Sequence, residues 1–293
     1  MVRIGRVQRW VRKTLGLGVF ISGIAWLLER RANQGVRILL YHKIADRPED
    51  ALCIGVEDFD RQMAYLAQHW RLVSLDEMMV AFRSGRQLPP RSVVVTFDDG
   101  YADNYTHAFP ILRKYRVPAT IFVVHDYIDT TRHYPWDDES EDHALTWAQI
   151  FDMQCHGISF GCHTLSHPLL NDIQIEEAFQ EIHESKARLE RRIGAMRYFA
   201  YPRGERRDFS APIKSIVAKE GFLAACSTIP GTNMPNSDWY ELRRTVVEPV
   251  DASPFQFRLL MMGVTDLILG LFRHGWASSR LPGVSHRCTE TRT

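Results

Sequence analysis

The chain has few cysteines, no excess of charge of one sign, and no apolar run long enough to span a bilayer comfortably. Five cysteines are scattered over 293 residues, too few for a disulfide framework, and their odd number favours a reducing compartment. The 36 Lys and Arg residues nearly balance the 35 Asp and Glu residues, which excludes strong bulk attraction to nucleic acid. The hydrophobic fraction of 45% is ordinary for a chain with a sizeable core.

The first 35 residues differ from the rest. A stretch rich in arginine precedes a charge-free run, TLGLGVFISGIAWLL at 14–28, and Glu29, Arg30 and Arg31 follow it. The run is shorter than the ~20 residues of a spanning helix, and the segment after it is a poor signal-peptide cleavage site. Three interpretations stay open: an interfacial or domain-packed helix, a membrane anchor, or a signal peptide. A cytoplasmic or inner-membrane-associated location is favoured over a secreted or periplasmic one, with peripheral membrane association as one expectation.

Short apolar runs alternate with helical patterns from residue 36 onward. Six runs are predicted to be strands: 36–41, 92–97, 119–124, 157–161, 197–201 and 222–226. Several of them lack polar alternation, which is typical of strands covered on both faces in a parallel sheet. Strand–helix alternation of this kind predicts an α/β fold with a parallel sheet or barrel.

The longest helical pattern covers residues 175–193. The spacing predicts one apolar side made of Ile175, Phe179, Ile182, Leu189 and Ile193, and Asn171 or Asp172 could cap the helix. A core-packed helix is therefore predicted between two strands.

Three stretches break the alternation. Residues 126–146 carry several acidic residues beside Tyr134 and Trp136, and they form either a solvated loop or the rim of a substrate cleft. Residues 235–244 are also loop-like. The tail from Leu281 onward is polar and is expected to fray.

Two adjacent acids, Asp98 and Asp99, follow the apolar strand SVVVTF and precede Gly100. Ionised carboxylates at the end of a buried strand are costly to desolvate unless something compensates them. The C-terminal mouth of a parallel barrel is where catalytic groups usually lie. Since adjacent residues on a strand point in different directions, one acid can bind a cation while the other stays free as a base. The alternative is an ordinary Asp-Asp-Gly turn.

Two histidines form a second constellation. His163 and His167 are four residues apart, directly after the strand at 157–161, and this spacing lets them converge on one ion. Two histidines and a carboxylate leave positions open for water and substrate, as a hydrolytic metal site requires. Cys162 is not expected to be a ligand, because the preceding strand would point it away from His163.

A third feature is the turn around Arg203, which Pro202 and Gly204 bracket. A backbone N–H placed there would suit an oxyanion. By itself this stretch is typical of an ordinary turn after a strand.

Together these motifs resemble the polysaccharide deacetylases, the NodB-like group of carbohydrate esterases. Three stretches match in the family's order: TFDDGYADN at 96–104, GISFGCHTLSHPLL at 157–170 and YFAYPRG at 198–204. LLYHKI at 39–44 and VPATIFVV at 117–124 are similar to the subgroup that acts on amino-sugar polymers. The resemblance covers about residues 36–249. It implies a distorted (β/α) barrel and metal-dependent removal of N-acetyl groups.

The resemblance also implies residue roles. Asp98 resembles the catalytic base. Asp99, His163 and His167 resemble the ligands of a divalent transition metal, which would be zinc or a similar ion. The backbone N–H of Arg203 is implied as an oxyanion donor.

The chain departs from the family in three places. The family's aromatic residue after the proline of the third stretch is here Arg203, which keeps the backbone role, whereas an arginine side chain would favour an anionic neighbour. Many members carry an arginine where this chain has Ala200. Arg243 or Arg244 could replace it by pairing with Asp98 and lowering its pKa, and the subgroup's Leu-x-Arg pattern favours Arg244; an ordinary surface arginine is the alternative. The late Leu-x-His motif has no convincing counterpart, so His42, after the strand at 36–41, is the expected general acid.

The expected organisation is a basic-apolar segment (1–35), a catalytic domain (36–250), and an amphipathic helix with a polar tail (251–293), in which His274 belongs to the helix. The expected substrate is an N-acetylated amino sugar of an oligo- or polysaccharide or of a lipid-linked glycan. An O-acetyl sugar esterase and a catalytically weak glycan-binding protein of the same fold stay open as alternatives. No nucleic-acid partner is expected, and the sequence predicts no oligomeric state.

Overall fold

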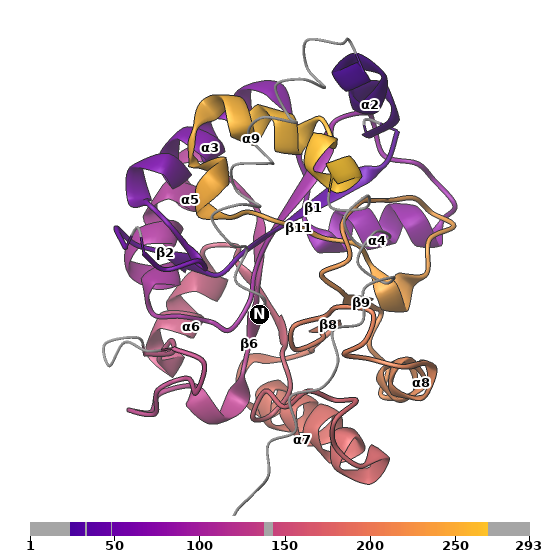
Figure 1. The fold of residues 1–293 in the computed structure, drawn as a ribbon. Coiled ribbons are helices and arrows are strands. Elements are labelled where there is room, and N and C mark those ends of the chain that lie inside the picture. The colour runs from indigo at the N-terminus through magenta and orange to yellow at the C-terminus, as the bar shows by residue number, and fades with distance from the viewer. Residues whose placement is uncertain (1–23, 33, 48, 138–142, 269–293) are drawn as a thin grey trace, which may run out of the picture.

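The computed structural model describes residues 24–32, 34–47, 49–137 and 143–268 of the chain (Figure 1). Its α-helices are α2 (Ile24–Ala32), α3 (Val56–His69), α4 (Leu75–Arg83), α5 (Phe109–Tyr115), α6 (Trp147–Cys155), α7 (Ile175–Ile193), α8 (Ala211–Lys219) and α9 (Pro254–Met261). Shorter helical turns are η1 (Asn104–Ala108), η2 (His125–Tyr127), η3 (Trp239–Glu241) and η4 (Pro249–Ala252). The predicted helix over 175–193 is thus confirmed.

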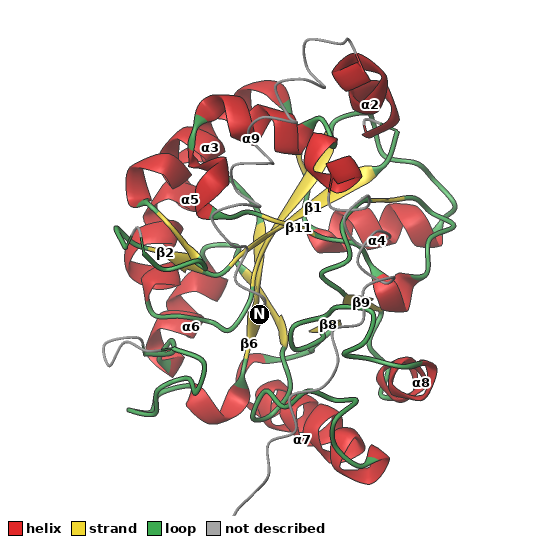
Figure 2. Cartoon of the chain, viewed as in Figure 1, coloured by secondary structure: helices red, strands yellow, loops and turns green. Residues whose placement is uncertain are grey.

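The strands form one curled mixed sheet and a small second sheet. Their bounds are β1 (Val36–Tyr41), β2 (Lys43–Ile44), β3 (Cys53–Ile54), β4 (Arg71–Leu72), β5 (Ser92–Phe97), β6 (Ala119–Val123), β7 (Ser159–Cys162), β8 (Tyr198–Ala200), β9 (Ala224–Cys226), β10 (Thr232–Asn233) and β11 (Thr245–Val246). The order in the large sheet is β10-β1-β5-β6-β7-β8-β9, and each pair from β1 to β9 is parallel. Strands occupy the centre and helices surround them (Figure 2). The predicted distorted α/β barrel is confirmed as a half-barrel.

The segment 242–246 touches both outer parts of the curled sheet. Leu242 bridges to Cys226 at the end of β9, whereas β11 pairs in parallel with Leu39 and Leu40 of β1. This segment therefore lies between β1 and β9, the two ends of the parallel part of the sheet. Arg244 lies in this segment, and its backbone N–H donates to the carbonyl of Ile229 at 3.0 Å.

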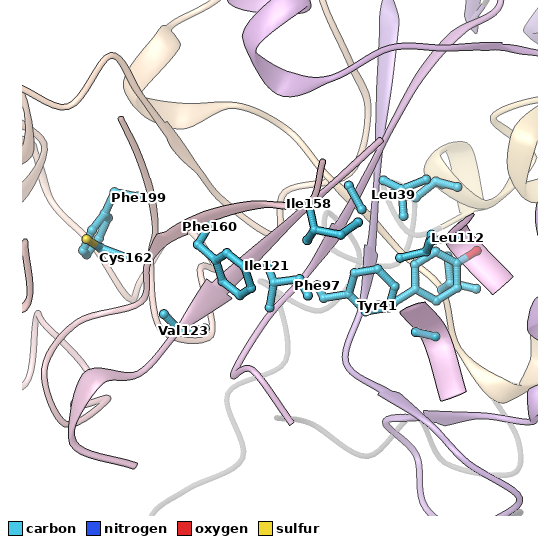
Figure 3. Close-up of a cluster of buried hydrophobic side chains, with 14 of the residues drawn as sticks. Leu39, Tyr41, Phe97, Leu112, Ile121, Val123, Ile158, Phe160, Cys162 and Phe199 are labelled. Atoms are coloured by element: carbon cyan, nitrogen blue, oxygen red, sulfur yellow. The ribbon is translucent and has the colours of Figure 1, made fainter. Parts of the chain in front are cut away.

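The two faces of the sheet belong to different apolar clusters. On β5, Val93, Val95 and Phe97 pack with the helices in the larger cluster, and Val94 packs with residues of α4 in the smaller one. Figure 3 shows part of the larger cluster, in which Tyr41, Phe97, Ile121 and Phe160 come from neighbouring strands. Because side chains alternate along a strand, Thr96 and then Asp98 follow Val94 on the face opposite to this helix-packed cluster.

The predicted start of α7 was wrong in detail. The N-cap is Gln174, whose backbone N–H donates to the Glu177 side chain. Asn171 instead donates its amide to the carbonyl of Arg207, because the chain makes one more turn before the helix begins. The predicted apolar side was also partly wrong, since Ile175 and Phe179 are exposed, whereas Ile182 and Leu189 are buried as predicted. The buried positions of the helix are Ala178, Ile182, Ser185 and Leu189.

The two ends of the described chain pack together. Leu28 of α2 contacts a small cluster that includes Leu259 and Met262, and Phe257 and Leu260 of α9 belong to the main core. None of the helices in the described ranges combines the length and apolar character that crossing a membrane requires. His274 and the tail from Leu281 lie outside the described residues.

Candidate metal centre

Asp98 and Asp99 lie at the C-terminal end of β5, and both are buried. The Asp98 backbone N–H donates to the carbonyl of Tyr41 at 3.0 Å, which continues the ladder between β1 and β5. Asp99 then has a φ of 69° and Gly100 a φ of 75°. A side chain on Gly100 would approach Val123 to 2.8 Å, so only glycine permits this turn. The turn separates the directions of the two carboxylates.

The histidines lie on a loop after β7. The Nδ1–H of His163 donates to the Ala200 carbonyl at 2.8 Å, which leaves the Nε2 lone pair directed at the acids. Nε2 of His163 and Nε2 of His167 each lie 3.5 Å from the same Asp99 oxygen. Cys162 is buried and is not among the converging groups, as the strand geometry predicts.

The geometry of this loop depends on a glutamate that the sequence did not point to. One carboxylate oxygen of Glu181, on α7, accepts from the backbone N–H groups of Leu165 and Ser166 at 2.9 Å each. Its other oxygen accepts from the Ser166 hydroxyl at 2.7 Å. Thr164 Oγ1 also accepts from the His167 N–H at 2.9 Å. The carboxylate therefore holds the backbone between the two histidines.

Asp99, His163 and His167 form a candidate metal site, because one ligand atom from each lies within 4.8 Å of the other two. Tetrahedral ligands at about 2.0–2.2 Å from a common ion are separated by roughly 3.4 Å. The distance of 3.5 Å from Asp99 to each imidazole fits that spacing. The three residues thus fit a divalent metal by donor type and by separation.

Electrostatics favour the ligand forms of two of these groups. Burial and the neighbouring His163 lower the pKa of His167 to about 3, so its imidazole is neutral, as coordination requires. Burial alone would raise the pKa of Asp99, but the histidines lower it below its usual value. For His163 the directions are reversed: burial alone would lower its pKa, but Asp98 and Asp99 raise it above its usual value. An ion at this point would replace the proton that these carboxylates favour on His163.

Asp98 makes a two-point ion pair with Arg244. Nη1 and Nη2 lie 2.7 Å from Oδ1 and Oδ2, and the Arg244 side chain is fully buried. Burial would raise the pKa of Asp98, but Arg244 and His163 lower it, so the carboxylate stays ionised. Arg243 points elsewhere, since its guanidinium donates to the Pro230 carbonyl at 3.2 Å. Of the two candidate arginines, the structure brings Arg244 to the acid.

His42 follows β1 and lies beside the acids. Tyr41 is the register partner of Phe97, so the next residues, His42 and Asp98, are neighbours across the two strands. Burial lowers the pKa of His42, and the negative charges of Asp99 and Asp98 oppose that shift. Asn104 donates its side-chain amide to the His42 carbonyl at 2.8 Å, which holds the backbone at this strand end.

Arg203 occupies the predicted turn after β8. Its φ is 57°, its carbonyl accepts from the Thr228 hydroxyl at 2.7 Å, and the Gly204 N–H donates to the Pro202 carbonyl at 2.6 Å. The backbone conformation of the turn is therefore held by neighbouring loops, and a side chain on Gly204 would meet Thr228 at 2.9 Å.

The loop beginning at residue 126 reaches the site. The ring centroid of Trp136 lies 4.1 Å from that of His167, and Tyr134 donates its hydroxyl to the Asp99 carbonyl at 2.8 Å. Of the two interpretations of this loop, the contacts favour a position beside the site. The presence of Tyr134 and Trp136 within an acidic loop was the signal available in the sequence.

Known proteins are similar to this chain in sequence and in fold. A family model described as polysaccharide deacetylase matches residues 85–224. YxkH of Bacillus subtilis (strain 168), which is named for the same family, is 27% identical over 227 residues, with 77% of this chain and 75% of that protein covered. Poly-beta-1,6-N-acetyl-D-glucosamine N-deacetylase of Escherichia coli (strain K12) is 32% identical over 125 residues, which are 40% of this chain and 19% of that protein.

A solved structure agrees with the fold. The Streptococcus pyogenes deacetylase PplD, determined in complex with acetate, superposes with a TM-score of 0.67 at 24% sequence identity, and 78% of this chain and 97% of that chain are covered. The half-barrel is thus that of a known deacetylase, and the matched sequence contains both acids and both histidines. Residues 85–224 of the chain therefore match the polysaccharide deacetylase family, and the fold agrees with that match.

Proposed function

We propose that this protein is a metal-dependent hydrolase that removes N-acetyl groups from amino sugars of an oligo- or polysaccharide or a lipid-linked glycan. The observation that carries the proposal is the division of labour between two adjacent acids. Asp99 faces two histidines at 3.5 Å, and Asp98 is bound by Arg244 at 2.7 Å. A binding protein would not need an ionised, buried carboxylate beside a complete ligand set.

The residues divide the chemistry among them. Asp99, His163 and His167 would hold a divalent cation, of which zinc is the first candidate because nitrogen and carboxylate ligands suit it. When bound, such an ion polarises a carbonyl oxygen and makes a water molecule more acidic. Asp98 would accept the proton of the attacking water, and Arg244 would hold its carboxylate in the orientation for that transfer. The bidentate pair keeps Asp98 ionised at neutral pH.

His42 and Arg203 complete the proposed machinery. Amide cleavage requires protonation of a leaving amine, and His42 lies across the strand pair from Asp98. Because burial lowers its pKa, His42 would take up its proton during the reaction, from the base, rather than carry it beforehand. The Arg203 N–H, on a turn with fixed conformation, would donate to the oxyanion.

The substrate class is supported by a relative's activity. The matched Escherichia coli protein is named as a deacetylase of poly-beta-1,6-N-acetyl-D-glucosamine. The region matched there is a part of that longer protein, so the polymer and its linkage are proposals for this chain. An O-acetyl sugar would use the same water-activating groups, and a direct comparison of the two substrate types is therefore needed.

Acetate release from a panel of N-acetylated and O-acetylated glycans tests the proposal. The panel should contain β-1,4- and β-1,6-linked N-acetylglucosamine oligomers, and each assay should be run with metal-depleted and reconstituted protein. We expect metal-dependent release from the N-acetylated oligomers. Preferential release from O-acetylated sugars would identify an esterase instead. Binding of the oligomers without any release by the reconstituted protein would identify a glycan-binding protein.

A further inference from the structure

An aromatic cluster lies beside the candidate metal centre. It consists of Tyr101, Tyr127, Tyr134 and Trp136. The rings of Tyr127 and Tyr134 are stacked at 4.4 Å, and Tyr134 lies 4.9 Å from Trp136. Trp136 is in turn 4.1 Å from His167. The cluster thus ends at one of the three residues that fit a metal ion, and Trp136 is its member at that end.

Trp136 is held in place by a buried polar network. Its Nε1–H donates to the Tyr101 hydroxyl at 3.0 Å, and that hydroxyl donates to Asp137 at 2.8 Å. Lys43 binds Asp137 and Asp50, each at 2.8 Å. The side chains of Lys43 and Asp137 are only 2% and 5% exposed. Breaking such a buried pair is costly, so the network fixes the loop that carries Trp136.

The indole combines this fixed position with exposure. Tyr101 and Tyr134 are 1% exposed, whereas Trp136 is 37% exposed. Its only polar atom is already satisfied by Tyr101, so the part that faces solvent offers an apolar π surface. An immobilised apolar surface loses little entropy when a ligand covers it. A pyranose ring, which presents a face of C–H groups, is a ligand of matching shape and chemistry.

We propose that Trp136 is a sugar-binding platform that receives a pyranose ring of the N-acetylated glycan beside the reacting acetamide. The inference rests on the proposed function for the identity of the ligand. Its own basis is the contact with His167, which places the indole beside the residues that the acetyl group of a bound sugar would reach. The platform would favour polymeric substrates over small acetyl compounds that lack a ring at this position.

Lys43 gives the platform a link to the catalytic strand. It directly follows His42, so two adjacent residues between the end of β1 and the start of β2 carry the proposed acid and the anchor of the platform. The position of the sugar would thus be set relative to His42 by neighbouring residues of the chain.

Kinetics of the full-length metal-loaded protein test this platform. Trp136→Ala, Trp136→Phe and the matched control Phe151→Ala, which removes an exposed aromatic ring on α6, should be compared with the wild type. The probes are a pentamer of N-acetylglucosamine and 4-nitrophenyl acetate. We expect KM for the pentamer to rise about tenfold in Trp136→Ala and less in Trp136→Phe. The change for the small ester should be several times smaller, and Phe151→Ala should match the wild type.

Three results would overturn the platform. The first is an unchanged KM for the pentamer in Trp136→Ala. The second is an equal loss with both probes. The third is loss of bound metal from this variant, which would make Trp136 a positioning residue for His167.

A wild type that releases no acetate from any glycan would contradict the proposed function but not the platform. Calorimetric titration with the same pentamer then tests the platform. Equal affinities of the wild type and Trp136→Ala for the pentamer would overturn the platform.

Discussion

Arg244 binds Asp98 through both terminal guanidinium nitrogens, Nη1 and Nη2, at 2.7 Å each, although the two residues are 146 positions apart in the chain. The contact forms because Arg244 lies in the segment that reaches from β9 to β1, and Asp98 ends the strand next to β1. The same guanidinium donates to the Ser227 carbonyl at 2.8 Å and lies 5.5 Å over the Phe122 ring. These contacts hold the Arg244 guanidinium independently of Asp98, so the guanidinium sets the orientation of the Asp98 carboxylate.

Arg244→Lys should lower acetate release about 100-fold while the protein keeps its metal. A lysine retains the charge but cannot make two parallel hydrogen bonds to one carboxylate. Because Asp98 is buried, loss of a bidentate contact should also lower the free energy of unfolding by about 1–3 kcal/mol. Arg243→Lys is the matched control, and its rate should equal that of the wild type. Equal effects of both substitutions would contradict the orienting role of Arg244.

His163→Ala and His167→Ala should each remove most of the bound metal, because two protein ligands remain at the site. Asp98→Asn should behave differently, keeping the metal and losing a factor of about 10² or more in rate, as expected for removal of a general base. Metal content by atomic absorption, measured beside acetate release, separates the two classes. Equal metal loss in Asp98→Asn and Asp99→Asn would show that the roles of the two acids are wrongly assigned.

His42→Ala should lose most turnover on acetamides and keep both fold and metal. Activated esters need little protonation of the leaving group, so their hydrolysis should decline much less. The comparison requires rates for an N-acetylated oligomer and for 4-nitrophenyl acetate with the same preparation. If both rates fall by the same factor, His42 binds substrate or supports the structure, and another group supplies the proton.

Glu181→Gln should weaken metal binding by about 10- to 100-fold, the range found for residues that hold metal ligands in place. The glutamate accepts three hydrogen bonds from the loop between the histidines, and an amide would place a donor against one of these donors. Glu184→Gln, at a half-buried position on the same helix that pairs with Arg188, is the control. Metal dissociation constants from calorimetry report this effect independently of turnover. If Glu181→Gln binds the metal as tightly as the control variant does, Glu181 has no role in holding the metal ligands.

Residues 1–35 are proposed to bind a membrane surface without serving the chemistry. Ile24, Trp26 and Leu27 of α2 are 45%, 57% and 59% exposed, and basic residues flank the apolar run in the sequence. A truncated protein that begins at Val36 should release acetate normally and bind anionic vesicles less in cosedimentation. The double substitution Trp26→Glu with Leu27→Glu should reduce vesicle binding in the full chain. Unchanged vesicle binding, or misfolding of the truncated protein, would favour a helix that only packs on the domain through Leu28.

The sequence predicted the main strands and the convergence of Asp99, His163 and His167 on a candidate metal site, because both depend on local patterns. Asp98 and Asp99 directly follow β5, His163 directly follows β7, and His167 lies four residues further along the same loop. Parallel strands end at one edge of the sheet, so these side chains meet without further information.

What the sequence could not predict depends on contacts between distant segments. Lys43 and Asp137 are 94 residues apart, and nothing local indicates that they pair. Glu181 resembles any surface glutamate on a charged helix until the loop beside it is known. The exposed position of Phe179 follows from the rotation of α7 on the sheet, which places Ala178 and Ile182 inward.

The central claim is that one divalent ion, held by Asp99, His163 and His167, works with Asp98 to release acetate from an N-acetylated glycan. Its most direct test is a titration of metal-depleted protein with zinc, in which acetate release from an N-acetylglucosamine pentamer is measured at each step. The account predicts that the rate of acetate release rises linearly and reaches a plateau at one equivalent of zinc per chain. It also predicts that Asp98→Asn binds one equivalent of zinc but releases acetate far more slowly than the wild type. Acetate release that is equally fast without metal, or that survives in His163→Ala at full rate, would contradict it.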